Sequence, residues 1–178
     1  MITVVIPYYQ REAGILAKAL ASIAAQQPAG MPVQVLVVDD ASPVPAEPEL
    51  EALGTFRNQV HVIRQPNGGP GAARNAGLDH APAGTRYIAF LDSDDTWSTD
   101  HLARATAALG AGYSFYFADH VQLGATVGAF ARAGRIQPGQ HPQIPGGKQC
   151  LYGYFAALEI AFHNHLVKIW LARCPNLW

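Results

Sequence analysis

The chain has 178 residues, which is long enough for one sizeable hydrophobic core, so a single domain is expected. With 12 Lys and Arg residues against 13 Asp and Glu residues, its net charge of −1 excludes the overall positive field typical of nucleic-acid-binding proteins. The two cysteines, Cys150 and Cys174, predict free thiols in a reducing compartment rather than a disulfide framework.

The N-terminal residues 1–12 lack the basic start and the long apolar stretch of a secretory signal, so the chain is expected to begin with a first strand of the fold. No window of the sequence reaches the roughly 20 apolar residues of a membrane-spanning helix. We therefore expect a cytoplasmic protein that can also contact the inner face of the membrane peripherally.

The first elements are a strand and a helix. Residues 2–6 form a β-branched run, and Pro7 is expected to end this strand. A helix is predicted over 12–27, with an apolar face of residues at spacings of three and four, Leu16, Ala19, Leu20 and Ile23. Such a face predicts a helix that covers a sheet.

Three more apolar runs predict strands at 33–40, 60–65 and 85–92. Between the first two lie a proline-rich loop at 41–48 and a weak helix at 48–54. Nearly continuous apolar strands that alternate with helices favour an α/β fold with a mainly parallel sheet, buried on both faces.

The sequence after residue 97 is less regular. Ser98 is expected to cap a helix over 98–109, and alternation predicts a strand over 113–123. The apolar segment 151–178 has two interpretations. It either packs in the core or between the subunits of a homodimer, or it forms an amphipathic helix on a membrane surface. Its few basic residues favour packing.

Polar residues follow each of the four predicted parallel strands. In open α/β sheets, ligands bind beyond the carboxyl ends of the strands, so these four segments are expected to converge at one edge. They are Tyr8, Tyr9 and Arg11 after the first strand, Asp39 and Asp40 after the second, the glycine-rich turn at 67–71 after the third, and Asp92, Asp94 and Asp95 after the fourth.

The segment FLDSDDTW at 90–97 places three carboxylates within four positions. Because these acids repel one another, a cation, hydrogen bonds or water must satisfy them. Mg²⁺ and Mn²⁺ usually take one or two carboxylates and fill the other positions with water and phosphate oxygens. The alternative is that these residues turn the chain and cap the next helix.

The segment NGGPGAARN at 67–75 has a glycine-rich turn before a helical pattern. Its backbone N–H groups could bind a phosphate at the start of a helix, with Arg74 adding positive charge. It lacks a full dinucleotide fingerprint, however, so a plain junction between loop and helix remains the alternative.

Taken together, VVIPYYQRE, VVDDAS, NGGPGAARNAGL and FLDSDD strongly resemble, in this order and spacing, the nucleotide-sugar-binding half of family 2 glycosyltransferases. The resemblance covers residues 1–105. It implies a single GT-A (Rossmann-like) domain with a mainly parallel central sheet flanked by helices. Residues 106–178 would then be a reduced or truncated acceptor-side segment of the same domain.

The resemblance also implies roles for individual residues. Asp92 and Asp94 would bind Mg²⁺ or Mn²⁺, with Asp92 also facing the ribose or sugar, Asp94 holding the metal that bridges the two phosphates, and Asp95 near the sugar. Of the two acids after the second strand, Asp40 is preferred over Asp39 as the nucleoside contact. The other implied substrate contacts are Pro7, Tyr8, Tyr9, Glu12, Gly71, Arg74, Asn75 and Ser93.

The reaction implied by the resemblance is inverting transfer of a sugar from a nucleotide-diphosphate donor, most simply a UDP-sugar, to a saccharide or glycolipid acceptor. Family members usually take the catalytic base from a Glu-Asp pair in the acceptor half. This sequence departs from that pattern, because the acids after Asp95 are Asp100, Asp119 and Glu159. Asp119 could line the sugar pocket, whereas Glu159 is a poor match for the base.

Two alternatives to a transferase follow from the same residues. A nucleotide-sugar-binding module without transferase activity would explain the missing Glu-Asp pair. A nucleotidyltransferase would share the metal-bound diphosphate, but it would carry a glycine-rich basic loop directly after the first strand. The first glycine of this chain is Gly14, which disfavours the nucleotidyltransferase.

Overall fold

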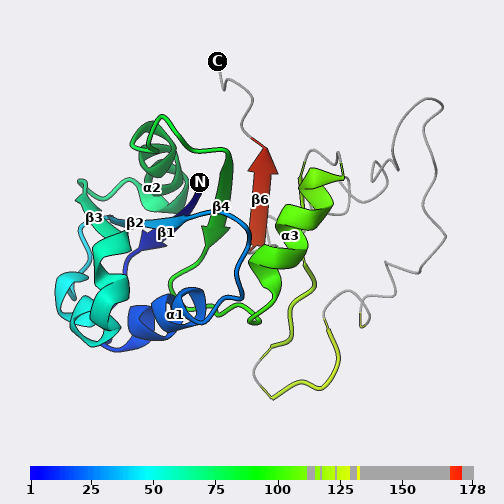
Figure 1. Cartoon of the computed structure of the whole chain (residues 1–178). Helices are drawn as coiled ribbons and strands as arrows, with labels where there is room; N and C mark the ends of the chain where they lie inside the picture. Colours follow the sequence, from blue (N-terminus) through cyan, green and yellow to red (C-terminus); the bar gives the residue numbers. More distant parts are fainter. Residues whose placement is uncertain (112–114, 117, 123, 129–131, 133–168, 174–178) are drawn as a thin grey trace. The chain divides into compact units, whose positions relative to one another are not determined.

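A computed structural model describes residues 1–111, 115–116, 118–122, 124–128, 132 and 169–173 of the chain. The chain divides into two compact units, one of Met1–Phe117 with Ile169–Trp178 and one of Ala118–Lys168. The predicted division between residues 105 and 106 stays a prediction. The first unit carries the central sheet (Figure 1).

The central sheet has six strands in the order β3-β2-β1-β4-β6-β5. The first four in this order are parallel, β6 is antiparallel to β4, and β5 is antiparallel to β6. The predicted α/β fold with a mainly parallel sheet is therefore confirmed. The strands are β1 (Ile2–Tyr8), β2 (Val33–Asp39), β3 (Val60–Arg64), β4 (Tyr87–Leu91), β5 (Phe115–Tyr116) and β6 (Ile169–Arg173).

Pro7 does not end the first strand, contrary to the sequence expectation. β1 continues to Tyr8, and Pro7 pairs in register with Val38 of β2. The backbone N–H of Asp40 donates to the carbonyl of Tyr8, so the backbone polar groups of Tyr8 point toward β2. Those of the preceding residue, Pro7, therefore point toward β4. On that side the pairing with β4 ends at Val5, so no ladder bond requires an N–H at Pro7.

The first helix, α1 (Ile15–Ala24), is shorter than the predicted 12–27. It begins after Gly14, whose φ of 84° lies in the left-handed region that favours glycine. The predicted apolar face is confirmed, because the four residues that define it are all buried, namely Leu16, Ala19, Leu20 and Ile23.

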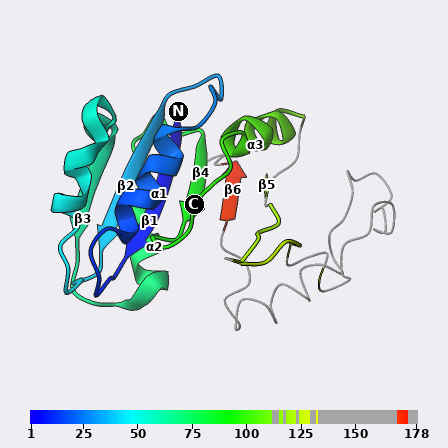
Figure 2. The ribbon, with the colours of Figure 1, turned by 90° about the horizontal axis from the view of Figure 1, so that it is seen from below.

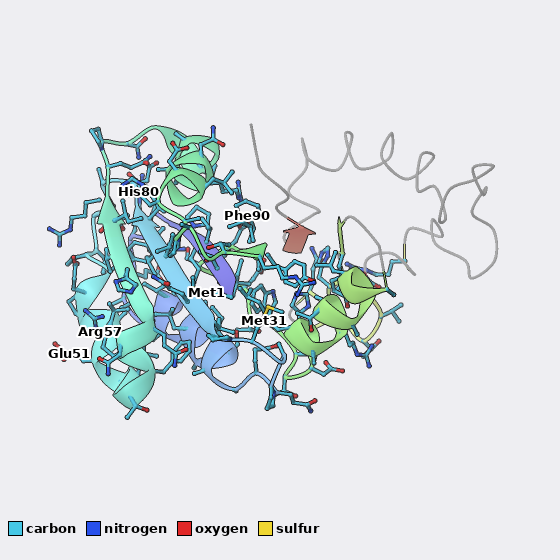
Figure 3. The ribbon with its side chains drawn as sticks, turned by 45° about the horizontal axis from the view of Figure 1, so that its top comes forward. Met1, Met31, Glu51, Arg57, His80 and Phe90 are labelled. Atoms are coloured by element: carbon cyan, nitrogen blue, oxygen red, sulfur yellow. The ribbon has the colours of Figure 1, made fainter. Side chains whose placement is uncertain are left out.

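Helices cover both faces of the sheet. Figure 1 shows α2 (Gly69–Asp79) above the strands and α1 below them, and from below α1 lies across β1 and β2 (Figure 2). The larger core joins α1, the 3₁₀ segment η1 (Glu47–Gln59) and α3 (His101–Gly110) to the sheet, and the smaller core lies under α2. Side chains fill both layers (Figure 3), with Met31 against the larger core and Phe90 against the smaller.

The close packing of α2 on β1 explains the glycine at position 77, in the last turn of the helix. The helix approaches β1 so closely that a Cβ added at Gly77 would clash with the side chain of Val5. A glycine inside a helix costs about 0.5–1 kcal/mol relative to alanine, and the close contact between helix and sheet offsets that cost.

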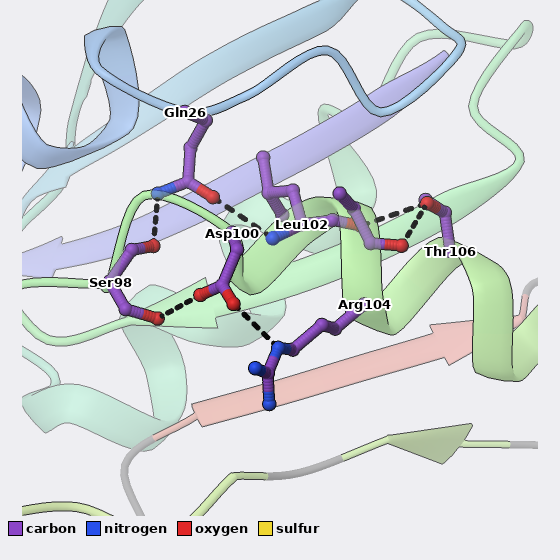
Figure 4. A network of polar contacts seen from close by, with 7 residues as sticks. Gln26, Ser98, Asp100, Leu102, Arg104 and Thr106 are labelled. Carbon is purple, nitrogen blue, oxygen red and sulfur yellow. Dashed lines mark hydrogen bonds and ion pairs between the residues drawn. The ribbon is translucent and has the colours of Figure 1, made fainter.

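Ser98 does not cap α3, contrary to the expectation. The helix begins at His101, and it is capped by the side chain of Gln26, which lies in the loop just after α1 (Figure 4). The Gln26 Oε1 accepts from the Leu102 N–H at 2.9 Å, and its Nε2 donates to the Ser98 carbonyl at 2.7 Å. The Ser98 hydroxyl instead donates to Asp100, which also accepts from Arg104.

Two further expectations need correction. The strand predicted over 113–123 is limited among the described residues to Phe115–Tyr116, and 118–122 is irregular. The weak helix at 48–54 is part of a longer 3₁₀ segment with a kink at Gly54. Of the predicted C-terminal packing segment, the described residues 169–173 form β6, and Glu159 lies outside the described part of the chain.

In the part of the chain that the structure describes, the length and apolar composition needed to cross a bilayer are not combined in any helix.

Candidate functional site

The carboxyl ends of the parallel strands meet at one edge of the sheet, as predicted. Tyr8 at the end of β1 is paired with Asp39 at the end of β2, and Asp39 is paired with Arg64 at the end of β3. The acidic segment follows directly after β4. The four segments singled out from the sequence therefore share this edge.

A cavity of about 560 Å³ opens beside the ends of β2 and β3. This volume lies within the roughly 300–1,000 Å³ of small-molecule sites. An acidic side chain and a basic one, Asp39 and Arg64, both reach it. The residues that line it are Asp39, Ala41, Ser42, Pro45, Arg64, Gln65 and Pro66.

The turn after β2 shapes one wall of this cavity. Ala41 has a φ of 57°, in the left-handed region that alanine rarely adopts. The turn is held by the Ser42 N–H, which donates to Oδ1 of Asp39 at 2.8 Å. Arg64, which also lines the cavity, forms an ion pair with Glu47 at 2.6 Å. The cavity is therefore lined by groups that can both accept and donate hydrogen bonds.

Asp40 faces the glycine-rich turn rather than the cavity. Asp40 is 3% exposed, and its carboxylate accepts from the N–H groups of Gly68 and Gly69, both at 2.8 Å, and from the Gln65 amide at 2.6 Å. Burial alone would raise the pKa of Asp40, but these three hydrogen bonds together hold the pKa below its usual value.

This geometry changes two expectations. The N–H groups of Gly68 and Gly69, expected to be open to a phosphate, already donate to Asp40. Asp39, which lines the cavity, is the better placed of the two acids for a nucleoside, although Asp40 was preferred from the sequence. The contact with the nucleoside stays a prediction for both residues.

The segment after β1 is tied to its neighbours through Gln10. The Gln10 N–H donates to the Ser42 hydroxyl at 2.8 Å, that hydroxyl donates back to the Gln10 carbonyl at 3.0 Å, and the Gln10 amide donates to Ser93 at 3.0 Å. Tyr9 is 44% exposed beside Gln10, and Glu12 is also exposed. Tyr8, in contrast, is fully buried.

Asp92, Asp94 and Asp95 form a cluster in which one carboxylate oxygen from each lies within 4.8 Å of the others. Two oxygens bound to one Mg²⁺ at about 2.1 Å are at most about 4.2 Å apart, so small side-chain rotations would place this cluster around an ion. Hard oxygen donors also suit Mg²⁺ and Mn²⁺. The residues present therefore fit a divalent cation.

The structure does not support the alternative in which these acids cap the next helix. The Asp95 N–H donates to the Asp92 carbonyl, which closes a turn, but α3 begins only at His101. Arg74 on α2 forms an ion pair with Asp92 at 2.6 Å. A basic side chain is thus held beside the acidic cluster.

The remaining predicted residues contribute less to the described geometry. Gly71 and Asn75 are exposed on α2, and Pro7 is buried within β1. Asp119 is exposed, and its Oδ1 accepts from the N–H of His120. Sequence reasoning missed Gln10 and Gln65, whose polar links join distant segments and leave no local pattern.

A family model described as glycosyl transferase family 2 matches residues 3–163. The chain belongs to glycosyl transferase family 2. Among curated relatives, the succinoglycan biosynthesis protein ExoW of Rhizobium meliloti (strain 1021) is 57% identical over 105 residues, which cover 58% of this chain and 32% of that protein. The chain thus spans about a third of the length of this family 2 relative.

Solved structures extend the likeness to the fold. S. aureus TarS 1-349 in complex with UDP-GlcNAc aligns with a TM-score of 0.57 and 30% identity, covering 71% of this chain and 36% of that one. The mannosyltransferase PcManGT from Pyrobaculum calidifontis, in complex with GDP-Man and Mn²⁺, aligns with a TM-score of 0.58 and 25% identity, covering 67% and 35%. These likenesses confirm the predicted GT-A fold.

Proposed function

We propose that this chain binds the nucleotide-sugar donor, preferably a UDP-sugar, of an inverting and metal-dependent glycosyl transfer. The observation that carries the proposal is the shared sheet edge, where the cavity lined by Asp39 and the cluster of Asp92, Asp94 and Asp95 both lie. A nucleoside diphosphate has matching parts, because its base and ribose need a cavity and its diphosphate needs positive charge.

Each residue of the site would contact a different part of the donor. The Asp39 carboxylate would accept a hydrogen bond from an N–H of the base or a ribose hydroxyl, and exposed Tyr9 would cover the base. Asp94 and Asp92 would hold Mg²⁺ or Mn²⁺, which stabilises the departing nucleoside diphosphate. Arg74 would add positive charge next to the diphosphate once Asp92 turns to the metal.

Titration calorimetry with UDP tests this proposal. We expect UDP to bind in the presence of Mn²⁺. The Asp94→Asn variant lacks a carboxylate that would hold the metal, so its affinity for UDP is expected to be at least tenfold weaker, about 1.4 kcal/mol. Asp79→Asn removes an exposed acid at the end of α2, away from the cluster, and is the matched control. Absence of UDP binding, or equal affinities of wild type and Asp94→Asn for UDP, would contradict the proposed function.

The acceptor side is proposed from the relatives. ExoW is named for succinoglycan biosynthesis and GgaA of Bacillus subtilis for minor teichoic acid biosynthesis, which supports a saccharide or glycolipid acceptor in polysaccharide assembly. A cytoplasmic location with peripheral contact at the inner membrane face would suit such an acceptor. A homodimer remains part of the same proposal.

A nucleotide-sugar-binding module without transferase activity is the second candidate. It is favoured by the acids after Asp95, which are Asp100, Asp119 and Glu159 and contain no Glu-Asp pair for a catalytic base. Donor binding without either sugar transfer or donor hydrolysis would favour this module, whereas release of UDP from a UDP-sugar would favour the transferase.

A further inference from the structure

Glu49 is a buried carboxylate that lies outside the acidic cluster and the cavity. It is 7% exposed and belongs to η1. Both of its oxygens accept a hydrogen bond, Oε1 from the Tyr8 hydroxyl at 3.1 Å and Oε2 from the Ala17 N–H at 2.9 Å. One side chain therefore joins the end of β1 to the start of α1.

The start of α1 depends on this remote carboxylate. The residue before the helix, Gly14, has no side chain and makes no cap. The first N–H groups of a helix have no partner within it, and the positive end of the helix dipole favours a negative charge there. Glu49 supplies both an acceptor and a charge to the first turn, from 32 positions further along the chain.

The contact with β1 involves the last residue of that strand. Tyr8 is fully buried, and its phenol points to Glu49. Burial raises the pKa of Tyr8, and the charge of Glu49 raises it further, so the phenol keeps its proton and donates a hydrogen bond to the carboxylate. A buried donor paired with a charged acceptor makes a strong link.

Between these two contacts lies the segment 9–14, which contains Tyr9 and Glu12, the predicted nucleoside contacts. We propose that Glu49 is a positioning residue that fixes both ends of segment 9–14 and so holds it ready for the nucleoside. The inference rests on the proposed donor site. Gln10 and Ser42 fix the middle of the segment separately.

The expected change in donor affinity follows from the entropy cost of ordering segment 9–14 on binding. Fixing the backbone of one residue changes an equilibrium by about tenfold, so release of even one residue of segment 9–14 would be visible in donor affinity. A residue that only stabilised the fold would lower the melting temperature without changing the affinity of the molecules that remain folded.

Four proteins test the inference, namely wild type, Glu49→Ala, Tyr8→Phe and Ile23→Ala. Ile23→Ala is the matched control, because it removes buried volume in the last turn of α1, away from the Ala17 contact. The two readouts are the Kd for UDP with Mn²⁺ by calorimetry and the amide hydrogen exchange of segment 9–14 in the free protein, both measured well below the melting temperature.

We expect Glu49→Ala to raise the Kd about tenfold and to speed exchange in segment 9–14, and Ile23→Ala to leave both near wild type. Tyr8→Phe removes the hydrogen bond to Glu49 at the β1 end and leaves the Ala17 contact in place, so it should raise the Kd less, about threefold. If Glu49→Ala does not fold, the Tyr8→Phe variant alone tests whether Glu49 positions segment 9–14.

Two results would overturn the inference: unchanged Kd and exchange in both Glu49→Ala and Tyr8→Phe, or equal changes in the Ile23→Ala control. If wild type itself does not bind UDP, the proposed function fails, and the exchange of segment 9–14 alone still decides whether Glu49 positions it.

Discussion

Replacing Asp40 with alanine is expected to lower the free energy of unfolding by about 2–4 kcal/mol at pH 7. The change leaves the N–H groups of Gly68 and Gly69 and the Gln65 amide without their acceptor, at the start of α2. The loss would be a large fraction of the total, since domains of this kind are stable by about 5–15 kcal/mol.

Urea unfolding at pH 7 measures this loss. Asp79→Ala, an exposed acid at the other end of α2, is expected to change stability by less than about 0.5 kcal/mol. A loss below about 1 kcal/mol in Asp40→Ala would mean that water replaces the carboxylate at the glycine turn.

The same carboxylate adds a pH dependence. The pKa of Asp40 is lower in the folded protein than in the unfolded chain, where it is about 3.9. Its contribution is therefore fully present above the unfolded pKa and is lost as the pH falls through the folded pKa. Asp40→Asn removes this titration, so its stability relative to wild type should improve at the acidic end of the range.

As the pH falls, protonation of His101 is expected to destabilise the fold before protonation of the protein's carboxylates does. His101 is 3% exposed, and its ring stacks on Trp97 with centroids 4.6 Å apart. It also packs edge-to-face with Tyr116, with centroids 5.6 Å apart. Among the described residues, its Nε2 has no hydrogen-bond partner. Burial lowers the pKa of His101 to about 4.

The protonation states of His101 in the folded and unfolded chain decide in which direction pH changes the stability. Above pH 6.5 the ring is neutral in both the folded and the unfolded chain, so it has no effect. Between pH 6.5 and pH 4 the unfolded chain binds the proton and the folded protein does not, which favours unfolding by about 3 kcal/mol at the lower end.

His101→Phe separates this contribution from that of the carboxylates. The phenyl ring keeps the stacking on Trp97 but cannot titrate. The wild type should lose about 2–3 kcal/mol more than His101→Phe when urea unfolding is compared at pH 7 and pH 4.5. Parallel pH profiles for the two proteins would show that His101 is protonated in the fold.

The four parallel strands and the shared edge could be predicted from sequence because they depend on local patterns. Apolar runs gave the four parallel strands, and the spacing of Leu16, Ala19, Leu20 and Ile23 gave the buried face of α1. Pro7 was misread because its tolerance within β1 depends on where β4 stops pairing, at Val5. That boundary is a property of the sheet and not of the segment.

The polar links of the site could not be predicted in the same way. Asp39 and Asp40 are adjacent, and only the tertiary structure shows that one lines the cavity and the other holds Gly68 and Gly69. Glu49 lies in a segment with weak helical character, and its partners are 32 and 41 positions away. Such contacts leave no periodic signal in the sequence.

The proposed function requires that this edge of the sheet bind a nucleoside diphosphate through a metal. A crystal structure with UDP and Mn²⁺, with the anomalous signal of manganese recorded, would show whether it does. We predict a manganese peak within bonding distance of an Asp94 carboxylate oxygen and of the diphosphate, with the base in the cavity beside Asp39. A diphosphate bound elsewhere, or manganese with no bond to Asp92 or Asp94, would rule out the proposed function.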